Sequence, residues 1–370
     1  MIYLDHNATT NVCSEVWNKM TDINAYGPIN PSSVHLYGQK GKSLIEEARR
    51  SIAYLLGFDM QYLDYQIVFT ASGTEANNLI ISNFRNYEIF ISAIEHTSIY
   101  EHIKYLPNIS IINVDKHGIL DIEDLVVKLS NSTSNKKLLS VMIANNDTGI
   151  IQPIQKICKI AHHHGALMHS DCTQAIGKID VNMLELDLDF LTISGHKFGG
   201  PMGAGALIAR TSYNLKPQII GGGQEKTIRS GTENVPAIVG LGVAAQLVKQ
   251  DLFKRYVHMV RLQYKLETML LTNKYVVDIV GNQVKRLPNT SLIINLNYTA
   301  EIHVVLLDLK GIAVSAGSAC SSGKSSPSHV LSAMGYSEDK IYSAVRISIG
   351  VKTTKEDINQ FIAIYNQISK

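Results

Sequence analysis

A lysine flanked by glycines and hydrogen-bonding residues is the most informative feature of this chain. Segment 193–201 reads ISGHKFGGP and follows an apolar run that is typical of a strand. The amine of Lys197 can form a Schiff base with a carbonyl compound, and pyridoxal phosphate is the usual partner. Ser194 and His196 can hydrogen-bond a phosphate, and the glycines allow close approach of the backbone. Taken alone, the segment fits a surface lysine in a glycine turn equally well.

A second motif supplies an acid at the end of a strand. Segment 166–174 reads ALMHSDCTQ, and its strand pattern ends near Asp171. An acid at the carboxyl end of a strand points into the crevice where α/β proteins bind ligands. A carboxylate there keeps a pyridine nitrogen protonated, and Gln174 can reach the phenolic oxygen of the same ring. A helix N-cap is the alternative for Asp171, but Lys197 downstream favours the cofactor role.

A third motif fits a phosphate-binding helix start. Residues 66–70 have a strand pattern, and segment 71–78, ASGTEANN, then opens a helix that we expect to reach about Phe84. The N-terminus of a helix carries free N–H groups and a partial positive charge, so it attracts phosphate. Thr74 can add a hydroxyl beside Gly73. An ordinary cap with Glu75 in the first turn is compatible with this role.

The order of these motifs resembles that of the cysteine desulfurases. These are fold-type I pyridoxal-phosphate enzymes of the class V aminotransferase kind, with nitrogenase-type and iron–sulfur-assembly-type members. The match runs nearly from end to end of the chain. It includes the Asp171 and Lys197 motifs and the segments YLDHNATT (3–10), NPSS (30–33), SGTEANN (72–78), EH (95–96), NN (145–146), GGGQE (221–225), RSGTEN (229–234) and GSAC (317–320).

The resemblance implies a fold, an activity and partners. The expected fold is an α/β fold-type I architecture, in which a mainly parallel sheet has helices on both faces and a smaller α+β domain is attached. The expected activity is that of a sulfurtransferase, which converts L-cysteine to L-alanine and passes the sulfur to an acceptor such as an iron–sulfur scaffold or a tRNA-thiolation protein. A homodimer is also implied. A selenocysteine lyase or an aminotransferase on the same fold is the alternative.

Four further residues are assigned to the site. His96 resembles the family's ring-stacking histidine, and an imidazole suits proton transfer because its pKa lies near neutrality. Asn145 is expected to contact the cofactor oxygen or the substrate. By resemblance, Thr232 reaches the phosphate of the other subunit. Arg346 alternates with apolar neighbours, and an inward arginine needs a partner, for which a substrate carboxylate fits and an internal Asp or Glu is the alternative.

Cys320 is expected to carry the chemistry that is specific to the family. Segment 315–327, SAGSACSSGKSSP, predicts a mobile loop because of its Ser and Gly content. The resemblance assigns to Lys197 the removal of the substrate Cα proton, and to Cys320 the attack on the substrate sulfur that yields a persulfide. A free cysteine is usually a small core residue, which this loop composition disfavours. Cys13 and Cys158 fit structural roles in helices, and Cys172 is expected to line the pocket.

Composition excludes several classes of protein. The chain has 370 residues, of which 45% are hydrophobic and 18% charged, as in a globular protein with substantial cores. A net charge of +2 with scattered basic residues gives no indication of nucleic-acid binding. The longest apolar run, 235–248, is too short and interrupted for a membrane span. Four cysteines and the lack of a signal-peptide pattern favour the reducing cytoplasm.

We expect no resident metal ion. His162, His163 and His164 are consecutive, and successive helix residues point about 100° apart, so the three side chains do not converge on one ion. Cys320, as a persulfide, would serve only as a transient ligand of an iron–sulfur cluster.

The elements that must position these residues alternate along much of the chain. Strand patterns cover 88–93, 110–114, 137–143, 166–170 and 190–193, and helical patterns cover 122–129 and 154–164. This alternation predicts a mainly parallel sheet covered by helices. After about Lys249 strands become fewer, with candidates at 288–297 and 311–316 and a last helix at 355–368. We therefore predict a large cofactor-binding domain at 13–249 and a small domain, made of 1–12 and 250–370, that carries the Cys320 loop.

Overall fold

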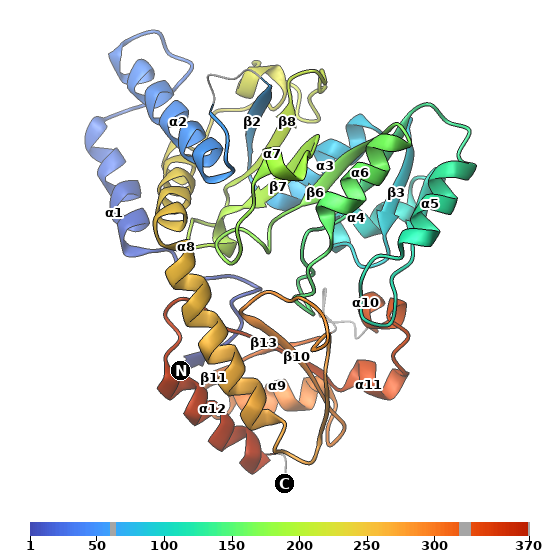
Figure 1. The fold of residues 1–370 in the computed structure, drawn as a ribbon. Helices are drawn as coiled ribbons and strands as arrows, with labels where there is room; N and C mark the ends of the chain where they lie inside the picture. The colour runs from blue at the N-terminus through green and yellow to red at the C-terminus, as the bar shows by residue number, and fades with distance from the viewer. Residues whose placement is uncertain (60–63, 318–326, 369–370) are drawn as a thin grey trace.

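A seven-stranded sheet forms the centre of the larger part of the molecule (Figure 1). The computed structural model describes residues 1–59, 64–317 and 327–368. In spatial order the strands are β2 (Tyr65–Thr70), β8 (Gly205–Arg210), β7 (Phe190–Ser194), β6 (Ala166–Asp171), β5 (Lys137–Ser140), β3 (Glu88–Ser92) and β4 (Ile109–Ile112). Neighbours pair in parallel, except that β8 is antiparallel to both β2 and β7. The predicted, mainly parallel sheet is confirmed.

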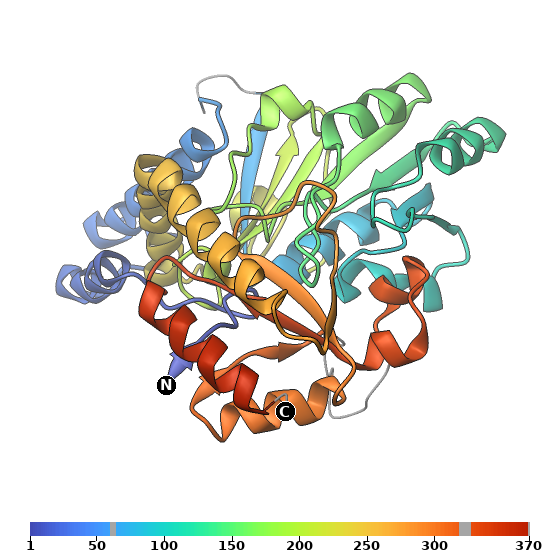
Figure 2. The same ribbon diagram turned by 60° about the horizontal axis from the view of Figure 1, so that its bottom comes forward.

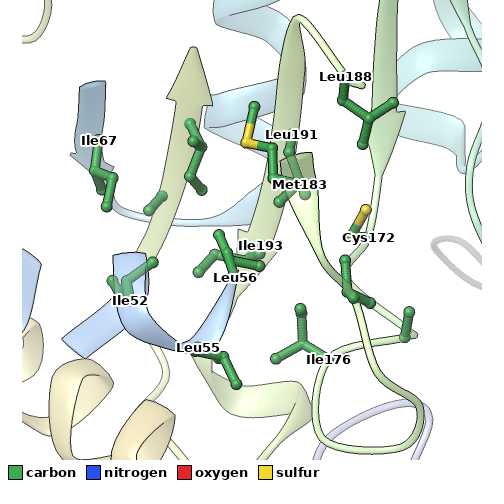
Figure 3. Packing of buried hydrophobic residues seen from close by; sticks show 14 of the residues in the cluster. Ile52, Leu55, Leu56, Ile67, Cys172, Ile176, Met183, Leu188, Leu191 and Ile193 are labelled. Atoms are coloured by element: carbon green, nitrogen blue, oxygen red, sulfur yellow. The ribbon is translucent and has the colours of Figure 1, made fainter. Parts of the chain in front are cut away.

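Helices cover both faces of this sheet. They are α1 (Ser14–Asp22), α2 (Leu36–Leu55), α3 (Gly73–Asn83), α4 (Thr97–Tyr100), α5 (Ile122–Asn131), α6 (Ile154–His163), α7 (Met183–Leu186) and α8 (Val235–Leu270). Successive strand side chains point to opposite faces. In β2, Ile67 and Phe69 therefore join a core with residues of α2, α6 and α8, whereas Val68 joins a second core with residues of α3. Figure 3 shows the first core, in which Ile52 and Leu56 face the sheet.

A four-stranded antiparallel sheet forms the centre of the smaller part. Its strands, in spatial order, are β12 (Ser315–Ala316), β13 (Ala344–Ser348), β10 (Thr290–Asn295) and β9 (Val276–Ile279). Beside it, β1 (Ile2–Tyr3) pairs in parallel with β11 (Ile312–Ala313), so the N-terminus lies against this part of the molecule (Figure 2). The remaining helices are α9 (Ala300–Asp308), α10 (His329–Ala333), α11 (Glu338–Tyr342) and α12 (Lys355–Ile368).

Helix α8 is shared by the two parts. Its 36 residues form one continuous helix, and the predicted boundary after Lys249 falls inside it. The buried residues between Val235 and Val248 belong to the core of the large sheet, and those between Met259 and Leu270 belong to the core of the small one. The apolar run 235–248 is thus explained by packing. None of the described helices has both the length and the apolar character needed to cross a bilayer.

The sheet brings several strand ends together. Because β2 and β7 are both antiparallel to β8, they share one direction with β3, β4, β5 and β6. The carboxyl ends of these strands consequently lie at one edge, where open α/β sheets bind ligands. The segments that follow β2, β3, β5, β6 and β7 contain the motifs singled out in the sequence.

Candidate active site

A cavity of about 730 Å³ lies where this edge of the large sheet meets the small sheet. Most of the predicted site residues form its wall: Gly73, Thr74, His96, Asp171, Gln174, Ser194, His196, Lys197 and Arg346. Asn145 and Thr232 do not line it. Cys320 lies outside the described residues.

Lys197 lies in a short 3₁₀ turn, Gly195–Lys197, directly after β7. Its Nζ donates hydrogen bonds to the backbone oxygens of Asn7 (2.6 Å) and Ala8 (2.8 Å). Burial, together with the nearby positive charge of Arg346, lowers the pKa of Lys197 to about 8. About a tenth of the amine is therefore unprotonated at pH 7, far more than for an ordinary lysine, and this form is the one that a nucleophile or a base requires.

Asp171 ends β6 and is held in place by neutral donors. Its Oδ2 accepts a hydrogen bond from Asn77 Nδ2 (2.8 Å), and its Oδ1 accepts one from the backbone N–H of Thr173 (2.9 Å). Below it, His169 is fully buried, and burial lowers the pKa of this histidine to about 4. No cationic side chain of the described residues forms an ion pair with Asp171, so the carboxylate is available to a cationic group in the cavity.

The start of α3 forms a cradle at the cavity wall. Ser72 caps this helix by accepting a hydrogen bond from the backbone N–H of Glu75 (3.1 Å). Gly73 brings the backbone close to its surroundings, since a Cβ there would lie 3.2 Å from Thr173 Oγ1 and 3.3 Å from Ser194 Cβ. The first N–H groups of α3 face this space with the positive end of the helix dipole. The arrangement suits an anionic group such as phosphate.

His96 is the N-cap of α4 and reaches the cavity. Its Nδ1 accepts a hydrogen bond from the backbone N–H of Ser98 (3.1 Å), so the neutral ring carries its proton on Nε2. The surrounding cavity walls desolvate the ring and lower the pKa of His96. Asn77 Nδ2 donates to Ser98 Oγ (2.9 Å) as well as to Asp171. Asn77, whose role was missed in the sequence, thus connects the Asp171 and His96 motifs.

Arg346 on β13 is already paired with internal carboxylates. One terminal nitrogen lies 2.9 Å from Asp147 Oδ1 and the other lies 2.8 Å from Asp5 Oδ1. The internal acids, given above as the alternative partner of this arginine, are therefore present. Arg346 nevertheless lines the cavity, so an incoming carboxylate would have to share its guanidinium with Asp5 and Asp147.

The expectation for Asn145 is wrong. This residue is fully buried in a turn, where its Oδ1 accepts hydrogen bonds from the backbone N–H groups of Asp147 and Thr148, both at 2.9 Å. Its Nδ2 donates to the backbone oxygen of Ile94 (3.0 Å). The polar atoms of this side chain form hydrogen bonds that stabilise the turn, and the neighbouring Asn146 lines the cavity instead. The Asn-Asn pair therefore lies next to the cavity, but Asn146 rather than Asn145 is the residue that lines it.

Comparisons with known proteins agree with this geometry. Residues 2–361 match the family model for class V aminotransferases. The cysteine desulfurase of Trichormus azollae is 38% identical, with 100% of this chain and 92% of the relative aligned. The solved structure of a NifS-like protein from Rickettsia africae is 45% identical with a TM-score of 0.95, over 100% of this chain and 99% of that one. SspA, solved in complex with cysteine, is 28% identical with a TM-score of 0.78, over 96% and 100% of the two chains.

The chain belongs to the class V aminotransferases, among the cysteine desulfurases. The resemblance inferred from the motifs is therefore confirmed, and so is the fold-type I architecture.

The cavity residues fit the pyridoxal phosphate used by class V aminotransferases. Thr173 Oγ1 and Asn77 Oδ1 are buried in the wall and have no hydrogen-bond partner among the described residues. Buried polar atoms are normally satisfied, so these two indicate a polar ligand. Thr173 lies beside the start of α3, where a phosphate is favoured. Lys197 offers the amine, and Asp171 the carboxylate for a protonated ring nitrogen.

Two of the predicted residues, Thr232 and Cys172, lie outside the cavity, and one further prediction concerns metal binding. Thr232 is exposed, in a loop that Arg229 attaches to α3 through an ion pair with Glu75 (2.9 Å). Its proposed role in another subunit stays a prediction. Cys172 is wrong as a pocket residue, because it does not line the cavity and is buried in the first core, where Figure 3 shows it near Ile176 and Leu188. In the described part of the chain, no group of three or more His, Cys, Asp or Glu residues is arranged to hold a metal ion.

Asn7 is a further site residue that sequence reasoning missed. It lies in the NATT motif and lines the cavity, and its backbone oxygen accepts from both Lys197 Nζ and Gln174 Nε2. Its side chain donates to the backbone oxygen of Asn146 (2.9 Å) and accepts from Lys178 (2.8 Å). The motif around Asn7 carries part of the family resemblance, but nothing in its spacing indicates contacts with these distant residues.

Proposed function

We propose that this protein is a pyridoxal-phosphate-dependent cysteine desulfurase, which releases L-alanine from L-cysteine and transfers the sulfur first to Cys320. The observation that carries the proposal is the convergence of Lys197, Asp171, His96 and the start of α3 on one cavity. The kinship with cysteine desulfurases over the whole chain supports the choice of substrate.

The cofactor, when bound, would supply a protonated ring that withdraws electrons from the substrate Cα. Around it, the chain provides groups with separate roles. The carboxylate of Asp171 keeps the ring nitrogen protonated. The Nζ of Lys197, with its pKa lowered to about 8, can accept the Cα proton near neutral pH. His96 presents Nε2–H to the cavity and can donate that proton.

Arg346 is proposed to bind the substrate carboxylate. Because Asp5 and Asp147 already occupy its two terminal nitrogens, the guanidinium is held rigidly before substrate arrives. Its charge is also compensated, so binding of a further anion is weaker than binding to a free arginine. The expected consequence is a modest affinity for the carboxylate together with strict orientation.

The sulfur step is proposed to need no external oxidant or reductant. The Cys320 thiolate attacks the substrate sulfur, an S–S bond forms, and the Cβ–S bond breaks. The electron pair of that bond stays on Cβ, which takes up a proton and leaves as the methyl group of alanine. Cys320 is left as a persulfide and can pass its sulfur to an acceptor protein, for which an iron–sulfur scaffold and a tRNA-thiolation protein are the candidates.

The direct test is product analysis with purified protein, pyridoxal phosphate and L-cysteine. We expect stoichiometric alanine and transferred sulfur, and no alanine from Lys197→Ala. Lys137→Ala is a matched control, because Lys137 lies at the amino end of β5, away from the cavity, and donates to the backbone oxygen of His164. A keto acid as the main product would favour an aminotransferase, and alanine from selenocysteine only would favour a selenocysteine lyase.

We also propose a homodimer that acts in the reducing cytoplasm. The exposed Thr232 and the loop held by Arg229 and Glu75 support a contribution to the neighbouring cavity. Mixed dimers of Lys197→Ala and Thr232→Ala chains contain one site in which both residues are intact. Such mixtures should bind cofactor better than the Thr232→Ala dimer does, and a fully active monomer would contradict the proposal. The three cysteines in the described residues are free thiols, as expected in a reducing compartment.

A further inference from the structure

Lys178 is a buried lysine beside the cavity for which the mechanism above has no use. Its side chain is 5% exposed, and no carboxylate forms an ion pair with it within the described residues. Its Nζ donates to Gln174 Oε1 (2.6 Å) and to Asn7 Oδ1 (2.8 Å). Burying an ammonium group without a counter-ion is unfavourable. A lysine in this position therefore requires an explanation.

The contacts of Lys178 match a neutral amine. An uncharged amine has two N–H donors, and two amide oxygens accept them. Burial lowers the pKa of Lys178 well below its usual value, and the charge of Lys197 lowers it further. On its other side, a small cavity of about 100 Å³ is lined by both Lys178 and Lys197. The lysine is thus an interior hydrogen-bond donor rather than part of a surface ion pair.

The hydrogen bonds fix how the amide of Gln174 is oriented. Gln174 Nε2 donates to the backbone oxygen of Asn7 (3.1 Å), which can only accept. Gln174 Oε1 is consequently the atom that faces Lys178. Asn7 is oriented in the same way, because its Nδ2 donates to the backbone oxygen of Asn146 (2.9 Å). Lys178 therefore contacts the acceptor ends of both amides and leaves their N–H groups for other partners.

We propose that Lys178 is a positioning residue, which presents the N–H of Gln174 to the cofactor cavity and holds Asn7 against Lys197. The proposal rests on the proposed pyridoxal-phosphate function and extends it to a residue that does not touch the cavity contents. Asn7 receives hydrogen bonds from Lys197, Gln174 and Lys178. Loss of Lys178 removes the hydrogen bond to Gln174 Oε1, whereas Asn289 Nδ2 still donates to Asn7 Oδ1 (3.0 Å). Gln174 is therefore the side chain that loss of Lys178 affects most.

The proposal predicts a spectroscopic change. When Lys197 carries the cofactor, a donor at the phenolic oxygen of the ring favours loss of the proton shared between that oxygen and the lysine nitrogen. Lys178→Met shortens the side chain only by the terminal amine and so removes the donor, which lets Gln174 rotate away. We expect the pH midpoint of the visible absorption change to rise by about 0.5–1 pH unit, the equivalent of one hydrogen bond. Apo-protein should also bind pyridoxal phosphate several-fold more weakly.

A double-mutant cycle separates positioning from a merely structural effect. Gln174→Ala should raise the same midpoint by a similar amount, and adding Lys178→Met to it should change the midpoint no further. Lys137→Met is the matched control and should leave the midpoint unchanged. Lys178→Arg retains the donors, and the adjoining cavity offers space for its larger head group, so it should restore most of the parent value. If Lys178→Met does not fold, a midpoint of Lys178→Arg shifted as far as that of Gln174→Ala would overturn the role of Lys178.

The outcomes distinguish this proposal from the proposed function. A parent protein without a visible band in the presence of pyridoxal phosphate would overturn the cofactor assignment itself. A parent with the band, together with an unshifted midpoint in Lys178→Met, would overturn only the role of Lys178. Additive shifts in the double variant would do the same, because Lys178 would then act independently of Gln174.

Discussion

Glu95 offers a sharp test of the electrostatics beside the active site. Its carboxyl group is fully buried behind His96, and burial raises its pKa to about 8. Oε1 accepts hydrogen bonds from Ser92 Oγ (2.5 Å) and the backbone N–H of Met142 (2.8 Å), whereas Oε2 has no partner among the described residues. A protonated carboxyl group can still accept both bonds at Oε1. Glu95→Gln places an amide oxygen in the same position and should fit without rearrangement.

The magnitude follows from proton linkage. Folding raises the pKa of Glu95 from 4.5 to about 8, so between these values the folded protein binds more protons than the unfolded chain does. The stability of the parent must therefore fall as the pH rises through this window. Each tenfold change in proton affinity is worth about 1.4 kcal/mol, so the full effect is on the order of 5 kcal/mol at pH 9. Glu95→Gln lacks this loss.

The assay is calorimetric unfolding of parent and Glu95→Gln at pH 5, 7 and 9, with the exposed Glu47→Gln as a control. The two proteins should unfold at similar temperatures at pH 5, and the variant should gain roughly 5 °C or more by pH 9. Glu47→Gln should follow the parent at every pH. A constant difference between Glu95→Gln and the parent from pH 5 to pH 9 would refute the reasoning, because no proton would then be linked to Glu95.

Three further predictions concern stability and cofactor binding. A hydrogen bond to Asp189 raises the pKa of His162 to about 10. This pair therefore stabilises the fold fully below pH 6.5, and its contribution disappears as the pH rises toward 10. The unfolding temperature of His162→Gln should be lower than that of the parent at pH 6 and should converge with it near pH 10. Arg49→Met leaves the buried Glu225 without its ion-pair partner and should lower the unfolding free energy by about 3–5 kcal/mol in denaturant titrations. Adding Glu225→Gln removes the unpaired charge and should restore part of the lost free energy. Gly205→Ala places a Cβ 2.8 Å from the backbone of Ser72, the cap of α3, and should lower the unfolding free energy by about 1–3 kcal/mol. It should also weaken the affinity for pyridoxal phosphate, which is measured by titration of apo-protein.

The sequence was most informative where the signal was local. Lys197, Asp171 and the start of α3 each follow a strand within a few residues, and parallel pairing of those strands brings them to one edge. A strand, followed by a helix or a turn, could therefore be predicted at each motif. The rule that ligands bind at the carboxyl ends of parallel strands then gave the position of the cavity. The antiparallel strand β8 does not disturb this rule, because it returns β2 to the direction of β7.

The sequence was least informative where partners are distant or a single turn decides. Lys178 contacts a residue 171 positions away, and Arg346 pairs with Asp5, 341 positions away. Nothing local to either residue indicates such a partner. Whether Asn145 or Asn146 lines the cavity depends on a turn in which the Asn145 side chain accepts hydrogen bonds from backbone N–H groups. The change of composition near Lys249 is real, but it reflects a helix that passes from one core to another rather than a break in the chain.

If sulfur leaves cysteine through Cys320, as proposed, a persulfide must form on this residue and can be detected there. Parent protein and Cys320→Ser are each incubated with L-cysteine and pyridoxal phosphate, alanine is quantified, and the peptide that contains residue 320 is analysed by mass spectrometry without reductant. We expect one extra sulfur atom on Cys320 of the parent, and alanine formation close to background in Cys320→Ser, because a hydroxyl is a far poorer nucleophile than a thiolate. Both proteins should show the same visible absorption. Alanine release by Cys320→Ser at the parent rate would contradict the account.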